Sequence, residues 1–274
     1  NPLPGGGLMI ILMLNILEEF DLAALGHNSA AYIAIVAEAM KYATIDKDRY
    51  MGDPNFIDVP VEKLASKDYA RAMAQKIKSG IKAHVERLND GAPESKDTTH
   101  LVVADDAGNV VNVTHSLGSS SGVITDGLGF MYNNCMMVFD PRPGNSGSLA
   151  AGKARFTAMC PTMLSKDGQF MLALGAPGGT TITMGVLQTI LNVVDFGMSA
   201  QEAVCAPRFC ATSDTIELTN RILRLAERDL NSAGYPTVRY AASYVTPIVH
   251  AIRCHEGRLD GGADPSGDGM AAAC

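Results

Sequence analysis

The sequence lacks the features of a membrane protein and of a nucleic-acid binder. Its unbroken apolar runs, such as Leu8 to Leu14, are far shorter than the roughly 18 residues that a membrane-spanning helix needs. It has no basic excess, since 22 lysines and arginines stand against 29 aspartates and glutamates, a net charge of −7. Nucleic-acid binding depends on such an excess. We therefore expect neither a membrane nor a nucleic acid among its partners.

Cysteine is also scarce and scattered. The six cysteines contain no C-x-x-C pair, and no group of cysteines and histidines has metal-ligand spacing. This pattern excludes a disulfide scaffold and predicts a protein that uses no metal or other cofactor. Isolated thiols favour a reducing compartment, so a cytoplasmic location is slightly favoured over a periplasmic or secreted one.

What the sequence does contain is ample apolar mass, because 47% of its residues are hydrophobic, enough for a large core. The first 96 residues have helical periodicity and predict helices at 8–20, 30–43 and 66–80. Asn28 or Ser29 is placed to cap the second helix, and Ser66 to cap the third. Residues 89–97 are polar and contain Gly and Pro, which is typical of an exposed linker or a cleavage site.

From Thr98 onward the pattern changes to strands mixed with helices. Residues 100–104 and 110–114 flank a turn sequence and predict a β-hairpin, and their runs of valine predict a sheet covered on both faces. A capping box at Ser199 and Glu202 predicts a helix start. Further strands are expected at 129–132, 169–174, 237–241 and 247–254, and further helices at 180–194 and 220–232. The order of elements predicts an α+β fold.

The junction of linker and first strand carries Asp97-Thr98-Thr99-His100. A threonine hydroxyl becomes a nucleophile when a base lies beside it. Cleavage before Thr98 would supply that base as its own α-amine, with a reference pKa of about 7.7–8.0. The plainer alternative is that two β-branched residues begin a strand and His100 is structural. The pair alone favours the alternative, so the case for catalysis depends on other motifs.

Such motifs occur in a fixed order along nearly the whole chain. They are Pro2-Leu3-Pro4-Gly5-Gly6-Gly7, Gly52-Asp53-Pro54, Thr98-Thr99-His100, Gly108-Asn109-Val110, Gly129-Phe130-Met131-Tyr132-Asn133-Asn134, Gly175-Ala176-Pro177-Gly178-Gly179, Ala206-Pro207-Arg208-Phe209 and Gly262-Ala263-Asp264-Pro265. Together they resemble the γ-glutamyltransferase family of N-terminal-nucleophile hydrolases.

The resemblance implies a fold and a set of partners. The fold is a four-layer αββα sandwich, here lacking its first strands and so incomplete at the N-terminus. Residues 1–97 resemble the mainly helical C-terminal part of the large subunit and end in a cleavable linker. Residues 98–274 resemble the small, catalytic subunit, which starts at the nucleophile. The implied partners are the missing N-terminal part of the large subunit, a heterodimeric arrangement of processed subunits that can dimerise further, and a small-molecule amide substrate.

The resemblance also implies catalytic roles. Thr98 is the nucleophile, and the bond between Asp97 and Thr98 is the site of self-cleavage. Ser116 stands where the family has a threonine that orients the nucleophile, and it keeps the hydroxyl. Gly178 and Gly179 match the oxyanion-hole glycines, whose backbone amides approach the tetrahedral intermediate closely.

The substrate site departs from the family. The Asn, Gln and Asp that meet the substrate's α-amino group fall on Gly118, Cys135 and Val138, and the Ser-Ser pair that binds its carboxylate falls on Thr157-Ala158. A site for an ammonium group loses most of its recognition without its carboxylate. Cys135 as a small buried hydrophobic residue is the plainer interpretation, and a reactive thiol the alternative.

The sequence therefore predicts an amidohydrolase or acyltransferase that uses an N-terminal threonine and forms an acyl-enzyme. Its substrate is expected to be a small acyl amide other than a γ-glutamyl compound. Two alternatives stay open: a true γ-glutamyltransferase or glutathione hydrolase, and a non-catalytic, unprocessed member of the family.

Overall fold

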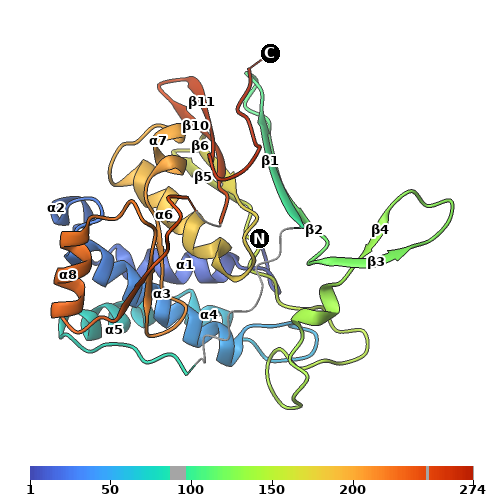
Figure 1. Cartoon of the computed structure of the whole chain (residues 1–274), viewed down its shortest axis with the longest axis horizontal. Helices are drawn as coiled ribbons and strands as arrows, with labels where there is room; N and C mark the ends of the chain where they lie inside the picture. The colour runs from blue at the N-terminus through green and yellow to red at the C-terminus, as the bar shows by residue number, and fades with distance from the viewer. Residues whose placement is uncertain (87–96, 245–246, 274) are drawn as a thin grey trace.

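The computed structural model describes residues 1–86, 97–244 and 247–273 (Figure 1). Apart from Asp97, the linker predicted at 89–97 lies outside these residues. None of the helices found in the described ranges combines the length and the apolar character needed to cross a membrane. The helices are α1 (Gly7–Leu17), α2 (Leu22–Leu25), α3 (Ala30–Tyr50), α4 (Val61–Leu64), α5 (Lys67–Lys78), α6 (Ile182–Val194), α7 (Ala200–Cys205) and α8 (Arg224–Ser232), with 3-10 turns η1 (Cys135–Val138) and η2 (Gly179–Thr181).

Local capping signals set the helix starts as the sequence predicts. The Ser29 and Ser66 hydroxyls accept hydrogen bonds from the backbone N–H groups of Tyr32 (3.1 Å) and Tyr69 (3.2 Å), so they cap α3 and α5. The capping box between Ser199 and Glu202 is present at the start of α7. Helix α3 runs seven residues beyond the predicted 30–43, because its second half stays packed in the core as far as Asp46.

The strands are β1 (Thr98–Ala104), β2 (Val110–Ser116), β3 (Ser120–Ile124), β4 (Met131–Asn133), β5 (Thr162–Lys166), β6 (Gln169–Gly175), β7 (Phe209–Cys210), β8 (Ile216–Leu218), β9 (Thr237–Arg239), β10 (His250–His255) and β11 (Arg258–Ala263). They form a four-stranded antiparallel sheet in the order β11-β10-β6-β5, a three-stranded sheet β7-β8-β9, and the two pairs β1-β2 and β3-β4. The sequence did not predict β11, whose adjacent glycines Gly261 and Gly262 disfavour a strand.

The four-stranded sheet lies between helices and the β1–β2 hairpin. Helix α6 packs against β6 on one side of the sheet. Helix α1 in turn contacts α6, α3 and α5. The hairpin packs against β6 and β10 on the other side (Figure 1). The Asn112 side chain fixes it there by donating hydrogen bonds to the carbonyl oxygens of Thr162 (2.8 Å) and Leu174 (3.1 Å). The described chain thus has three layers: helices, sheet and hairpin.

The outer face of the hairpin is bare in the described chain. The antiparallel register places Leu101 opposite Val113 and Val103 opposite Val111. All four side chains are 42–58% exposed, although they are aliphatic. The prediction of a sheet covered on both faces is therefore wrong for this chain. The valine runs indicate a cover that none of the described elements supplies.

A second apolar surface continues from the hairpin. The β3–β4 pair projects away from the body of the molecule as a long loop (Figure 1). It exposes Val123, Ile124, Leu128 and Phe130, and the adjacent turn η1 exposes Met136 and Met137.

One hydrophobic core unites the two segments that the sequence analysis separated at residue 97. Leu12 of α1 and Met40 of α3 belong to the same buried cluster as Leu187 of α6 and Leu174 of β6. The two segments therefore fold as one unit. That the boundary divides two subunits stays a prediction.

Candidate active site

The β1–β2 register brings two hydroxyl groups together. Thr98 is the first residue of β1 and lies opposite Ser116, the last residue of β2. Side chains alternate between the faces of a strand, so Thr98 shares the inner face with His100. The Thr98 Oγ1 and Ser116 Oγ atoms are 2.7 Å apart, a hydrogen bond in which either oxygen can donate. The structure thus pairs the predicted nucleophile with the residue predicted to orient it.

The peptide bond before Thr98 is held by backbone groups of the facing strand. The carbonyl oxygen of Asp97 accepts a hydrogen bond from the Leu117 backbone N–H at 3.0 Å, and the Ser116 Oγ lies 3.4 Å from it. The Asp97 carboxylate accepts a hydrogen bond from the Ser120 backbone N–H at 2.6 Å. Sequence motifs did not reveal these amides, because a backbone N–H carries no side-chain signal. The hairpin register alone could have pointed to Leu117.

Two of the predicted substrate-binding residues lie beside the hydroxyl pair. The Gly118 backbone N–H donates to Ser116 Oγ at 2.9 Å, which places residue 118 next to the nucleophile's partner. Gly118 has a φ of +74°, and a Cβ there would lie 3.1 Å from the Cys135 Sγ. Glycine is therefore suited both to the left-handed backbone and to the close approach of the thiol. Val138, at the other end of η1, is exposed.

The Gly178–Gly179 turn lies at the end of β6. The His100 ring packs against Gly175, and Asn112 bonds to Leu174, so the chain beyond Gly175 continues toward the Thr98 end of the hairpin. Both glycines have positive φ, +146° and +59°. Among the described residues neither glycine hydrogen-bonds to Thr98.

The buried ion pair of Arg208 and Asp264 supports this turn through Pro247. A Cβ on Gly178 would lie 2.6 Å from Pro247, and the Ile248 backbone N–H donates to the Pro177 carbonyl oxygen at 3.0 Å. The Pro247 carbonyl oxygen accepts a hydrogen bond from Arg208 at 2.9 Å, and Arg208 also pairs with the fully buried Asp264. The turn therefore packs against Pro247, which is held in place by the buried Arg208–Asp264 ion pair.

Thr157 is not brought to the hydroxyl pair. It precedes β5, and its backbone N–H donates to the Pro4 carbonyl oxygen at 2.9 Å. Its hydroxyl accepts a hydrogen bond from the Met159 N–H at 3.2 Å. The predicted carboxylate-binding role of Thr157 is thus without a contact to the other site residues in the described chain.

His100 fills the space between the hairpin and the sheet. Its side chain is buried, its Nδ1 lies 2.9 Å from the Thr114 hydroxyl, and its ring stacks on His250 with centroids 6.5 Å apart. Burial, and then the neighbouring His250, lower the pKa of His100 from 6.5 to about 4. A neutral ring packed in this way agrees with the structural role expected of it.

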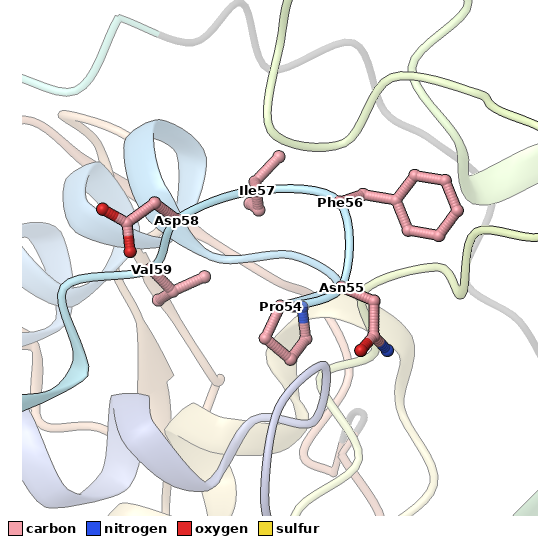
Figure 2. Close-up of a pocket in the computed structure, with 6 residues that line it drawn as sticks. All are labelled: Pro54, Asn55, Phe56, Ile57, Asp58 and Val59. Carbon is pink, nitrogen blue, oxygen red and sulfur yellow. The ribbon is translucent and has the colours of Figure 1, made fainter.

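The described chain offers neither a metal site nor a second candidate active site. Across the described ranges no three His, Cys, Asp or Glu side chains gather where a metal ion could be held. The loop from Pro54 to Val59 lines a shallow hollow, in which Phe56 and Asp58 point in different directions (Figure 2). Asp58 is the one ionisable residue among those that line it, and none of the predicted site residues lies there, so the hollow is not a candidate active site.

Comparisons with known proteins identify the family. The family model for gamma-glutamyltranspeptidase matches residues 1–274. The chain belongs to the gamma-glutamyltranspeptidase family. It is 40% identical over 276 residues to the acylase ACY 1 proenzyme of Pseudomonas sp. (strain V22), covering 99% of this chain and 49% of that protein. It is 38% identical over 223 residues to the glutathione hydrolase proenzyme of Escherichia coli (strain K12), covering 76% of this chain and 38% of that protein.

A solved structure confirms the fold class. The crystal structure of cephalosporin acylase from Bacillus halodurans matches the whole chain with a TM-score of 0.84 and 26% identity, over 50% of that chain. The resemblance inferred from the motifs and the α+β fold are thus confirmed. The chain spans about half the length of the curated relatives it matches.

The neutral His100 makes the fold sensitive to acid. Because its pKa is about 4 in the folded chain and 6.5 ordinarily, the unfolded chain binds a proton in this range that the folded chain excludes. The free energy of unfolding therefore falls as the pH drops from about 6.5 to about 4. At 1.36 kcal/mol per pKa unit, the full loss is on the order of 3 kcal/mol.

Urea unfolding at pH 7 and pH 4.5 measures this effect. The His100→Gln variant should lose less stability between the two values than the unsubstituted protein. The exposed His115, on the outer face of the same hairpin, provides the matched control His115→Gln, which should keep the full pH dependence. Equal losses in the unsubstituted protein and His100→Gln would contradict the prediction.

Proposed function

We propose that this protein is an amidohydrolase in which Thr98 attacks an amide and forms an acyl-enzyme. The observation that carries the proposal is the 2.7 Å contact of the Thr98 and Ser116 hydroxyls at the Asp97–Thr98 bond. Cleavage of that bond converts the Thr98 nitrogen from an amide into an amine, which can accept the hydroxyl proton. Family membership supports the same chemistry.

The reaction follows from these groups. The free amine of Thr98 removes the proton of its own hydroxyl as Oγ1 bonds to the substrate's carbonyl carbon, and the Ser116 hydroxyl orients Oγ1. The amides of the Gly178–Gly179 turn stabilise the oxyanion, and one such donor is typically worth about 2.7–4 kcal/mol. Collapse expels the amine product, protonated by the Thr98 ammonium. Water then hydrolyses the ester and regenerates the hydroxyl.

Substitution of Thr98 tests the proposal in the full-length precursor. Thr98→Ala removes the one hydroxyl used in both steps, so self-cleavage and amide hydrolysis should both disappear. Thr98→Ser keeps a hydroxyl and should retain part of each, whereas Thr99→Ser, one residue on, should behave like the unsubstituted protein. Fragments on a denaturing gel and release of a chromogenic amine measure the two activities. A Thr98→Ala protein that still hydrolyses amides would show that Thr98 is not the nucleophile.

The substrate of this proposal is a small acyl amide without an α-ammonium group. Gly118 and Cys135 lie beside the hydroxyl pair and offer no charge, and Val138 has no carboxylate to pair with an ammonium. The likeness to the acylase ACY 1 proenzyme supports this choice. A glutathione hydrolase activity is the second candidate, supported by the 38% identity to the Escherichia coli proenzyme.

Comparison of substrates distinguishes these candidates. The ammonium of a γ-glutamyl amide would lose hydrogen bonds to water in this site without gaining partners, and each such bond to a charged group is worth roughly 1.5–3 kcal/mol. Glutaryl amides, which have no ammonium, should therefore exceed γ-glutamyl amides in kcat/KM by a factor of about ten or more. Val138→Asp should raise kcat/KM for the γ-glutamyl amide, and Val138→Asn, which adds no charge, should raise it less. A preference of the unsubstituted enzyme for γ-glutamyl amides would favour the second candidate.

We infer that the outer face of the hairpin binds the N-terminal part of the large subunit. Leu101, Val103, Val111 and Val113 form a continuous exposed aliphatic patch, of the kind that marks an interaction site. This chain covers 49% of the acylase ACY 1 proenzyme. The segment proposed to cover the patch belongs to the other half of such a precursor. Subunits processed from one precursor would then stay associated through this face.

Cysteine labelling in the full-length precursor tests the interface. Val111→Cys lies in the middle of the aliphatic patch and should react with a thiol reagent only after denaturation. The control Leu225→Cys, on the exposed side of α8, should react in the folded protein. Peptide mass spectrometry separates both from the natural cysteines. Rapid labelling of Val111→Cys in the folded precursor would show that the patch is free.

A further inference from the structure

The carbonyl group at the Asp97–Thr98 bond already has donors around it. Its oxygen lies in the ladder of the β1–β2 hairpin, where the Leu117 backbone N–H donates to it at 3.0 Å. The Ser116 Oγ is the second neighbour, at 3.4 Å. A carbonyl approached by two donors is polarised, which is the condition for attack by a nucleophile.

The Ser116 hydroxyl has one hydrogen and three neighbours. It accepts from the Gly118 N–H at 2.9 Å, and it lies 2.7 Å from Thr98 Oγ1 and 3.4 Å from the Asp97 carbonyl oxygen. That carbonyl can only accept, so when Ser116 directs its hydrogen there, its second lone pair is left to accept the Thr98 proton. The resulting chain runs from the Thr98 hydroxyl through the Ser116 hydroxyl to the Asp97 carbonyl.

We propose that self-cleavage uses an oxyanion site of its own, formed by the Leu117 amide and the Ser116 hydroxyl and distinct from the Gly178–Gly179 turn that serves substrate turnover. The proposal rests on the proposed function of Thr98 as the nucleophile. It gives Ser116 a second role, as a proton relay during maturation.

The protons balance along this chain. As Thr98 Oγ1 bonds to the Asp97 carbonyl carbon, its proton passes to Ser116 Oγ, and the Ser116 proton passes to the carbonyl oxygen. Negative charge develops on this oxygen before the Ser116 proton reaches it, and the Leu117 N–H stabilises that charge. The tetrahedral intermediate that results is neutral. The C–N bond then breaks, and the Thr98 nitrogen takes the proton from that oxygen through Ser116. Water hydrolyses the ester, giving the Asp97 carboxyl group and a free Thr98 hydroxyl.

The separation of the two oxyanion sites follows from their positions. Leu117 continues β2, on the same hairpin as the bond to be cut, whereas Gly178 and Gly179 follow β6 in another sheet. The Ser120 amide bonds the Asp97 carboxylate at 2.6 Å, which holds the carbonyl in register with Leu117. Within the described chain the amides of Gly178 and Gly179 form no hydrogen bond with Asp97.

The experiment measures the rate of self-cleavage of the full-length precursor on a denaturing gel. Replacing Leu117 by its α-hydroxy acid turns the N–H into an ester oxygen and should slow cleavage about a hundred-fold or more, as for loss of an oxyanion donor. The same replacement at Val113, in the same strand away from Asp97, is the matched control and should cleave at the normal rate. Ser116→Ala should be as slow as the Leu117 ester, and Ser116→Thr should restore cleavage.

Replacing Gly179 by glycolic acid provides the opposite test, because it removes the amide hydrogen of the turn without adding a side chain at the positive φ of residue 179, and it should leave the self-cleavage rate within a few-fold of normal. Normal cleavage by the Leu117 ester, or cleavage by the Gly179 ester as slow as by Ser116→Ala, would overturn the two-site proposal. Thr98→Ala keeps this outcome distinct from failure of the proposed function. If Thr98→Ala still cleaves, Thr98 is not the nucleophile; if it does not cleave and the Leu117 ester does, only the separate oxyanion site is wrong. Thermal unfolding of each precursor checks that it is folded.

Discussion

The antiparallel register of the β1–β2 hairpin is the constraint on which the candidate site depends. It sets Thr98 opposite Ser116, and because side chains alternate along a strand, a slip of one residue between the strands would put the two hydroxyls on opposite faces. The same register puts the Leu117 amide opposite the Asp97 carbonyl. Thr98, Ser116 and the Asp97–Thr98 bond are thus positioned by one ladder of backbone hydrogen bonds.

The hairpin in turn depends on its attachment to the four-stranded sheet. Asn112 donates two hydrogen bonds to backbone carbonyls of that sheet, and His100 fits against Gly175, where a Cβ would lie 2.3 Å from the ring. A methyl group at residue 175 would force the buried His100 ring, or the strand that carries it, to shift. Gly175 therefore makes room for the ring that packs the first strand, which begins at Thr98, against the sheet.

The sequence predicted those features that depend on local chemistry. The serine caps of α3 and α5, the capping box of α7 and the hairpin at residues 100–114 all arise from residues close together in the chain. Tertiary features were harder to predict. The β11 strand contains two glycines, the Leu117 and Ser120 amides have no side-chain signature, and the position of Thr157 depends on contacts with the N-terminal loop. The valine runs predicted a sheet covered on both faces, and this was wrong for the described chain, because no described element covers the outer face of the hairpin.

Release of Asp97 would change what Ser116 can do. In the proposed self-cleavage, the single Ser116 hydrogen is directed to the Asp97 carbonyl oxygen, and the two lone pairs face Gly118 and Thr98. Once Asp97 has left, that hydrogen could turn to the Thr98 oxygen, while Gly118 still donates to Ser116. The proposed maturation would therefore convert Ser116 from a proton relay into a hydrogen-bond donor to Thr98, and both reactions would use the pairing that the hairpin register sets.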